Sequence, residues 1–121
     1  RPSFHTMPLA WFKHLPTPCF ALDKDARFLY VNDAFAELTG YRAEELVKAR
    51  FDSLLADTGI RDCLKDLLDL YQGHPMVSAS HDLIRKNKAK THVVLDVAPV
   101  YEGGSKKVTH AIGIVLSRKR V

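Results

Sequence analysis

The side chains that could do chemistry in this chain are two cysteines, six histidines and a helix-spaced group of aspartates. Cys19 and Cys63 lie far apart and neither has a second cysteine near it, so the sequence supports neither a zinc pair nor a disulfide framework. We expect both to be free thiols. Cys63 falls on a predicted helix, where a small buried residue is favoured over a thiolate ligand.

Among the histidines, His81 is the candidate for a functional role. Alternation along its predicted strand places it on the same face as Leu83, which we expect to be the inner face of a sheet. An inward imidazole could ligate a metal, bind an anionic ligand or sense pH, and a core histidine with satisfied hydrogen bonds is the alternative. His74 and His92 are expected to face outward.

The aspartates Asp62, Asp66 and Asp69 are spaced four and three residues apart, on one face of a helix. Arg61 and Lys65 interleave with them, which favours a solvated helix face over a cation site. The sequence has no nucleophile elbow, no phosphate-binding glycine loop and no HExxH motif. We therefore expect no enzymatic activity.

These side chains must be positioned by elements that the hydrophobic pattern predicts. A helix over residues 4–15 is indicated by apolar residues spaced three or four apart, and Pro16 would end it. We expect its apolar face, with Met7, Trp11 and Leu15, to pack on the outer face of a sheet and to mediate dimerisation.

Two short strands at 18–23 and 27–32 are predicted next, because turn residues separate two runs of β-forming residues. Asn32 or Asp33 would cap a helix over residues 34–39, and Gly40 would end it. Short helical segments are expected around 42–46 and 51–55.

The longest helix is predicted over residues 60–72. Its apolar positions are Ile60, Leu64, Leu67, Leu68 and Tyr71, with charged residues on the other side. Three strands follow, at 76–84, 91–100 and 108–116. Strands grouped at both ends of the chain, around central helices, indicate an α+β domain with a five-stranded antiparallel sheet covered by helices on one face.

Charge is distributed unevenly along the chain. The formal net charge is +4, and 11 of the 18 basic residues follow residue 60. They cluster near predicted turns and at the C-terminal end without interleaved aromatic residues, so we interpret them as solvated hairpin tips and disfavour a nucleic-acid partner. No apolar run is long enough for a membrane span.

The order of elements and the residues at their joints resemble a PAS (Per-Arnt-Sim) sensory domain of the bacterial signal-transduction type. The resemblance is carried by residues 20–46, with the run Val31-Asn-Asp-Ala-Phe-Ala-Glu-Leu-Thr-Gly-Tyr-Arg-Ala-Glu-Glu-Leu46, and by the C-terminal stretch from Val97 to Gly113. It implies an N-terminal cap over residues 1–16, a PAS domain over 17–117 and the start of a linker over 118–121.

The resemblance also implies a function. PAS domains are cytoplasmic sensory and dimerisation modules within larger regulators, such as histidine kinases, diguanylate cyclases or phosphodiesterases, and transcriptional regulators. We expect a homodimer that regulates a covalently attached output domain. Many family members end in Asp-x-Thr, which anchors the output helix, and this chain has Ser117-Arg118-Lys119 there. That substitution puts the coupling mode in question.

The ligand of a PAS domain, where there is one, lies between the longest helix and the inner sheet face. Light-oxygen-voltage members carry a photoreactive cysteine that the stretch Lys48–Leu55 lacks, and Leu83, Val93 and Val115 stand where polar flavin partners are expected, so photoreactive flavin is disfavoured. Haem is disfavoured because residues 60–72 contain no histidine.

The predicted pocket wall is therefore mostly aliphatic. It could hold a small apolar or weakly polar molecule oriented by Tyr71 and His81, or it could be filled core in a ligand-free interaction domain. The predicted ligand-binding residues are Leu67, Tyr71, His81, Leu83, Leu95, Val97 and Val115. The cofactor remains unassigned by the sequence.

Overall fold

The computed structural model describes residues 6–120 of the chain, and side chains from Ala10 onward. Five antiparallel strands form one sheet in the order β2-β1-β5-β4-β3. The strands are β1 (Cys19–Leu22), β2 (Phe28–Val31), β3 (Met76–Ile84), β4 (Lys90–Val100) and β5 (His110–Arg120). The predicted α+β class and five-stranded sheet are confirmed.

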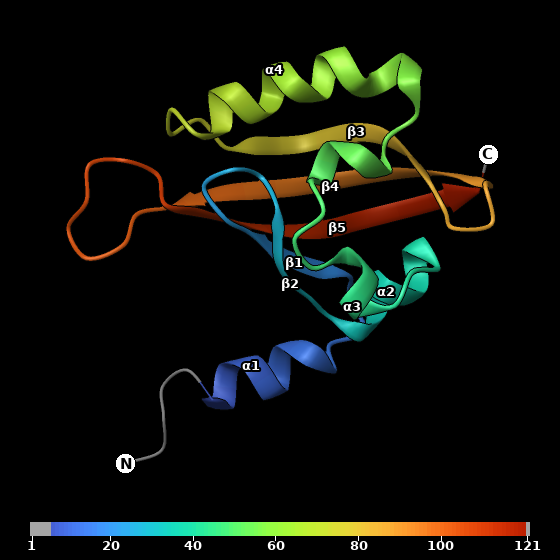
Figure 1. Ribbon diagram of the computed structural model, residues 1–121, viewed down its shortest axis with the longest axis horizontal. Coiled ribbons are helices and arrows are strands. Elements are labelled where there is room, and N and C mark those ends of the chain that lie inside the picture. The colour runs from blue at the N-terminus through green and yellow to red at the C-terminus, as the bar shows by residue number, and fades with distance from the viewer. Residues whose placement is uncertain (1–5, 121) are drawn as a thin grey trace.

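Helical segments surround the sheet, which lies between α4 and α1 (Figure 1). They are α1 (Thr6–Lys13), α2 (Asp33–Thr39), α3 (Ala43–Leu46), the 3-10 turns η1 (Phe51–Leu54) and η2 (Asp57–Gly59), and α4 (Ile60–Leu70). Within residues 6–120, no helix has the length and apolar character that a membrane crossing requires. The first two residues of the helix predicted over residues 4–15, and the side chain of Met7, lie outside the described part.

The first hairpin is tied to α2 by one buried asparagine. Asn32 caps α2, since its Oδ1 accepts hydrogen bonds from the backbone N–H of Phe35 at 3.0 Å and of Cys19 at 2.9 Å. Its Nδ2 donates to the carbonyl of Thr17 at 2.8 Å. Gly40 ends the helix with φ of 78°, as predicted. One amide thus fixes the start of β1, the end of β2 and the start of α2.

The buried face of α4 is not the predicted one. Cys63, Leu67 and Leu70 are buried, whereas Leu64 is 39% exposed and Leu68 is 68% exposed. The buried residues Cys63, Leu67 and Leu70 are also spaced four and three residues apart. The sequence therefore contains two apolar stripes, about 100° apart around the helix, and either could have been the buried one. The stripe that contains the small Cys63 packs against the sheet, and the predicted inclusion of Leu64 and Leu68 was wrong.

The last strand is longer than predicted. β5 continues to Arg120, and its residues 117–120 pair with residues 91–94 of β4. The expected strand end at Leu116 was therefore wrong, and Ser117 lies inside the strand. These polar residues stay in the sheet because they form ladder hydrogen bonds with β4. The strand end was misplaced because hydrophobic alternation stops after Leu116.

Candidate functional site

The predicted ligand-binding residues lie together in the interior. Leu67 comes from α4, Leu83 from β3, Leu95 and Val97 from β4, and Val115 from β5; His81 is also buried, and Tyr71 packs against the same cluster. Their common place between α4 and the inner sheet face agrees with the sequence prediction. Their role in ligand binding remains a prediction.

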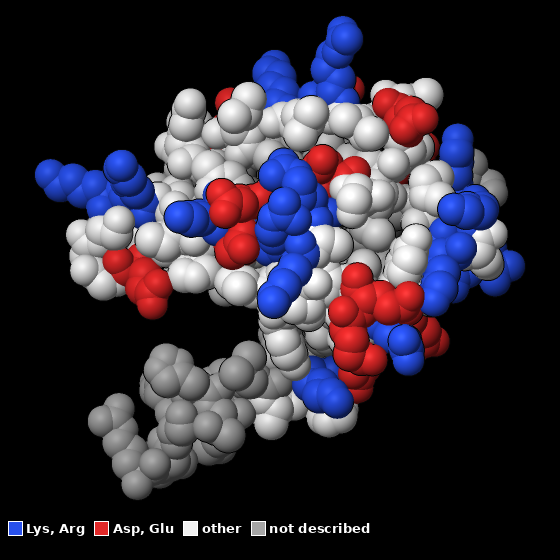
Figure 2. All heavy atoms as spheres, viewed as in Figure 1, with Lys and Arg blue, Asp and Glu red and all other residues white. Residues whose placement is uncertain are grey.

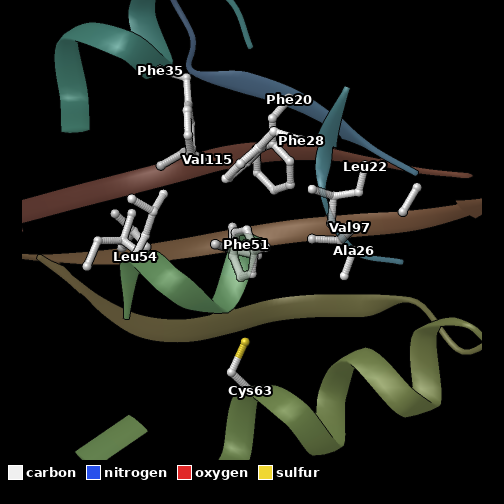
Figure 3. Packing of buried hydrophobic residues seen from close by; sticks show 14 of the residues in the cluster. Phe20, Leu22, Ala26, Phe28, Phe35, Phe51, Leu54, Cys63, Val97 and Val115 are labelled. Carbon is white, nitrogen blue, oxygen red and sulfur yellow. The ribbon is translucent and has the colours of Figure 1, made fainter. Parts of the chain in front are cut away.

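Four phenylalanines occupy the neighbouring part of this interior (Figure 3). The ring of Phe20 lies 5.7 Å from that of Phe28, 5.1 Å from that of Phe35 and 5.3 Å from that of Phe51, measured between centroids. A Cβ added at Gly113 would lie 2.1 Å from Cζ of Phe20, so this ring rests directly on the β5 backbone. The inner face of the sheet is filled here by aromatic side chains.

Sequence reasoning missed Phe20, Phe28 and Phe51 as part of this interior. The available signal was a glycine within a strand, since Gly113 in the middle of β5 marks close approach of another group. In the structure Phe20 on the adjacent β1 lies opposite Gly113, a pairing across two strands that the sequence alone does not show.

Tyr71 joins the end of α4 to the β1–β2 turn. Its hydroxyl donates a hydrogen bond to the carbonyl oxygen of Asp23. Burial raises the pKa of Tyr71 to about 12. The hydroxyl predicted to orient a ligand therefore holds α4 against the hairpin.

His81 is buried on the inner side of β3, as predicted. Its Nε2 lies 3.5 Å from Oδ2 of Asp66 on α4, and it has no hydrogen-bond partner among the described residues. Burial lowers the pKa of His81, while the carboxylates of Asp66, Asp62 and Asp82 oppose this shift. The arrangement holds a neutral imidazole beside a partly exposed carboxylate.

Both cysteines are buried free thiols. Burial raises the pKa of Cys63 to about 12, with the Asp52 and Asp66 carboxylates acting in the same direction, and burial also raises the pKa of Cys19. A thiol held protonated is a poor ligand and nucleophile. Within the described part of the chain, no three His, Cys, Asp or Glu side chains gather closely enough to hold a metal ion.

Leu83, Val93 and Val115, which stand where polar flavin partners were expected, all lie on the inner face. Leu83 and Val93 are buried at 1% and 0% exposure, and Val115 at 4%. Their inward orientation, which the family resemblance implied, is confirmed. His74 is exposed, as expected. His92 is half-buried, and its Nδ1 lies 2.8 Å from Oδ1 of Asp82 across the β3–β4 ladder.

A second candidate site lies between α1 and the outer face of the sheet. A hollow of about 620 Å³ opens there, with a mostly apolar lining. Trp11 and Leu15 contribute from the N-terminal segment, and Ile112 and Ile114 from β5. Trp11 is 69% exposed, so a large aromatic surface faces solvent beside the groove. Below, "outer groove" means this hollow.

α1 is held in place from its other side. The ring of Phe12 lies 5.1 Å from that of Tyr30 on β2, measured between centroids. Nδ1 of His14 lies 3.3 Å from Oδ2 of Asp33 at the start of α2. Two of the predicted dimerisation residues, Trp11 and Leu15, are thus presented at the groove.

Solved structures of similar fold cover nearly the whole chain. The chain resembles a domain of a sensory box sensor histidine kinase/response regulator from Geobacter sulfurreducens, with 20% identity and a TM-score of 0.75 over 93% of this chain and 92% of that one. It resembles the PAS domain of a protein from Colwellia psychrerythraea, with 12% identity and a TM-score of 0.79 over 98% of each.

A third similar structure is the Rhodobacter sphaeroides LOV protein, with 18% identity and a TM-score of 0.76 over 89% of this chain and 62% of that one. No curated protein matches the chain. At these identities the likeness shows the fold, a sheet of five antiparallel strands with helices packed around it.

The sequence model of one family, described as PAS fold, matches residues 7–117. This match covers most of the chain, and it includes the capped helix, the long helix, strands β1 to β4 and most of β5. The chain belongs to the PAS family.

Proposed function

We propose that this PAS domain is a regulatory module of a larger signalling protein and that it works by pairing with a second copy through α1 and the outer groove. The observation that supports this is the apolar hollow between α1 and the outer sheet face, with Trp11 exposed at its edge. Exposed apolar patches of this kind mark interaction surfaces.

The filled interior favours interaction over ligand sensing. The rings around Phe20 occupy the inner face, and the aliphatic residues of the predicted wall belong to the same buried cluster. The sensory role then depends on changes in how two copies meet. A signalling output such as a histidine kinase would respond to that geometry.

The test is the oligomeric state of the domain, measured by analytical ultracentrifugation over a range of concentrations. We expect the wild type to dimerise and Trp11→Glu or Ile112→Glu to be monomeric, because a buried unpaired carboxylate is costly at an apolar interface. Leu68→Glu is the matched control, since Leu68 is as exposed as Trp11 but lies on α4.

A wild type that remains monomeric at all concentrations would contradict the proposal. Dissociation by Leu68→Glu and not by Trp11→Glu would move the interface to α4. Circular dichroism melting of each variant shows whether the fold is retained, which separates a lost interface from a lost structure.

A second candidate function is sensing of a small ligand through the predicted wall. The unpaired Nε2 of buried His81 favours it, because such a group is usually hydrogen-bonded. Native mass spectrometry of the purified domain tests this. A mass addition that disappears in His81→Leu supports a ligand, and an unmodified mass contradicts it. A Soret band after haem reconstitution would identify haem as that ligand.

A further inference from the structure

A hollow lined by cations lies where the β3–β4 turn meets the end of β5. Figure 2 shows Lys and Arg side chains gathered along the edge where Figure 1 places the C-terminal end of β5. The hollow measures about 550 Å³. Five cationic side chains line it, Arg85, Lys90, Arg118, Lys119 and Arg120, with Glu37 as the acidic lining residue. Below, "basic hollow" means this site.

Strand register brings two arginines into the basic hollow. Arg118 pairs with Val93 and Arg120 with Thr91, and these β4 residues are buried on the inner face. Residues opposite each other on paired strands project to the same side. A register shift at Leu95 moves β5 by one residue relative to β4, which turns Arg118 and Arg120 inward. They extend the inner face at the end of the sheet.

A third cation is braced in position. Nε of Arg85 donates to the carbonyl oxygen of Leu38 at 3.0 Å, and its Nη2 donates to that of Glu37 at 3.4 Å. These carbonyls belong to the last turns of α2, so the helix end fixes the guanidinium. A fork held in place loses little conformational freedom when it binds an anion.

The cationic side chains of the basic hollow outnumber its one carboxylate, that of Glu37. Among residues 6–120, no ion pair includes any of its five cationic side chains, whereas neighbouring Lys86 contacts Glu45 at 2.8 Å. Cations gathered at one concave site repel each other and attract an anion of high charge. Glu37 opposes this attraction.

We propose that the basic hollow binds the phosphate chain of a small polyphosphate, either inorganic or part of a nucleotide. Arginine forks match phosphate oxygens in pairs; Arg118 and Arg120 reach the hollow from β5, and Arg85 reaches it from the β3–β4 turn. Its volume is in the range of small-molecule sites. The proposal is independent of the outer groove, which lies between α1 and the outer sheet face.

Isothermal titration calorimetry with inorganic tripolyphosphate, ATP and AMP tests the site. We expect Arg118→Gln/Arg120→Gln to weaken tripolyphosphate binding at least about tenfold. The matched control is Lys106→Gln/Lys107→Gln, which removes the same charge from the exposed β4–β5 loop and should change affinity less than about twofold. Glu37→Gln should tighten binding, since it removes the opposing carboxylate.

The ligands separate the two sources of the phosphate chain. Equal affinity for tripolyphosphate and ATP indicates recognition of phosphate alone, whereas tighter ATP binding indicates that the nucleoside contributes. Weak binding of AMP is expected with either source, because it carries one phosphate. Melting curves of the variants check the fold.

Three results would overturn the proposal. The first is no heat with tripolyphosphate or ATP at concentrations of ~1 mM. The second is an equal loss of affinity in the Lys106/Lys107 control, which would indicate non-specific attraction to a cationic protein. The third is tighter binding of a single-stranded RNA or of anionic lipid vesicles, which would assign the charge to a macromolecular partner.

Discussion

Among single residues, His81 on β3 is buried with its imidazole facing α4. A buried, neutral histidine whose Nε2 has no hydrogen-bond partner among the described residues is a source of pH dependence, because the unfolded chain can protonate it and the folded chain resists protonation. The carboxylate nearest to the imidazole is that of Asp66 on α4, and the charges of Asp62 and Asp82 also act on the imidazole.

Because of His81, the unfolding free energy should therefore decrease as the pH is lowered. The folded pKa is below the ordinary 6.5, so the stabilisation is complete above about 6.5 and is lost as the pH drops below it. We expect the unfolding free energy of the wild type to fall, relative to that of His81→Leu, between about pH 7.5 and pH 5. Urea unfolding at each pH measures it.

Exposed His74 provides the control, since His74→Gln should retain the wild-type pH dependence. A difference between the wild type and His81→Leu that is constant with pH would contradict a neutral buried imidazole. An inverted slope would instead assign the dominant interaction to an ion pair of protonated His81 with Asp66.

Asn32 is the residue on which three segments depend. Replacing it with alanine removes the α2 cap and leaves the N–H of Cys19 and the carbonyl of Thr17 without this partner in a buried site. We expect Asn32→Ala to cost about 2–4 kcal/mol of unfolding free energy, measured by urea denaturation.

The control for Asn32→Ala is the same substitution at Asn87, an exposed asparagine with one local hydrogen bond. Asn87 accepts from the N–H of Ala89 at 2.9 Å in the β3–β4 turn, so Asn87→Ala should cost less than about 1 kcal/mol. Similar costs at both positions would show that the buried network around Asn32 contributes little.

At the scale of elements, β1 and β5 depend on a contact between a ring and a backbone. Any side chain at Gly113 meets the Phe20 ring, because the position of its Cβ is already occupied. We expect Gly113→Ala to destabilise the domain by about 1–3 kcal/mol through overpacking, measured as a lower unfolding free energy.

Gly59→Ala is the matched control, because nothing lies within 4 Å of a Cβ at Gly59 and its φ of −103° suits alanine. The double variant Gly113→Ala/Phe20→Leu should recover part of the loss, since a smaller side chain makes room for the methyl group. Additive losses in the double variant would contradict a direct clash between the two positions.

Prediction from the sequence succeeded where a residue type has one structural use. Asn32 and Gly40 marked the limits of α2 because capping oxygens and left-handed backbone favour those residues. The buried stripe of α4 was missed because leucines stand on two adjacent stripes, and only the neighbouring sheet decides between Leu64 and Leu67.

The filling of the interior and the position of the basic hollow could not be predicted from the sequence either, because both depend on how separate strands pair. Strand alternation placed His81 and Leu83 correctly, but filling of the interior depends on how Phe20 meets Gly113 across two strands. Arg118 and Arg120 face inward because of a register shift between β4 and β5. Hydrophobic alternation cannot predict that shift, because residues 117–120 of β5 are all polar.

At the scale of the whole molecule, the proposed interaction surfaces occupy different parts of one sheet. The outer groove uses the outer faces of β4 and β5 near α1, and the basic hollow uses their opposite face at the sheet end. Both include residues of β5, so a single central strand connects the two proposed sites.

The place of β5 also determines how the molecule responds to mechanical force. β5 has β1 on one side and β4 on the other, and its pairing with β4 runs from His110 to Arg120. Traction along this strand would load a long row of hydrogen bonds simultaneously in shear rather than one after another. β5 would then resist extension, and a displacement of one end of the strand would be transmitted along its axis to the other end of the sheet.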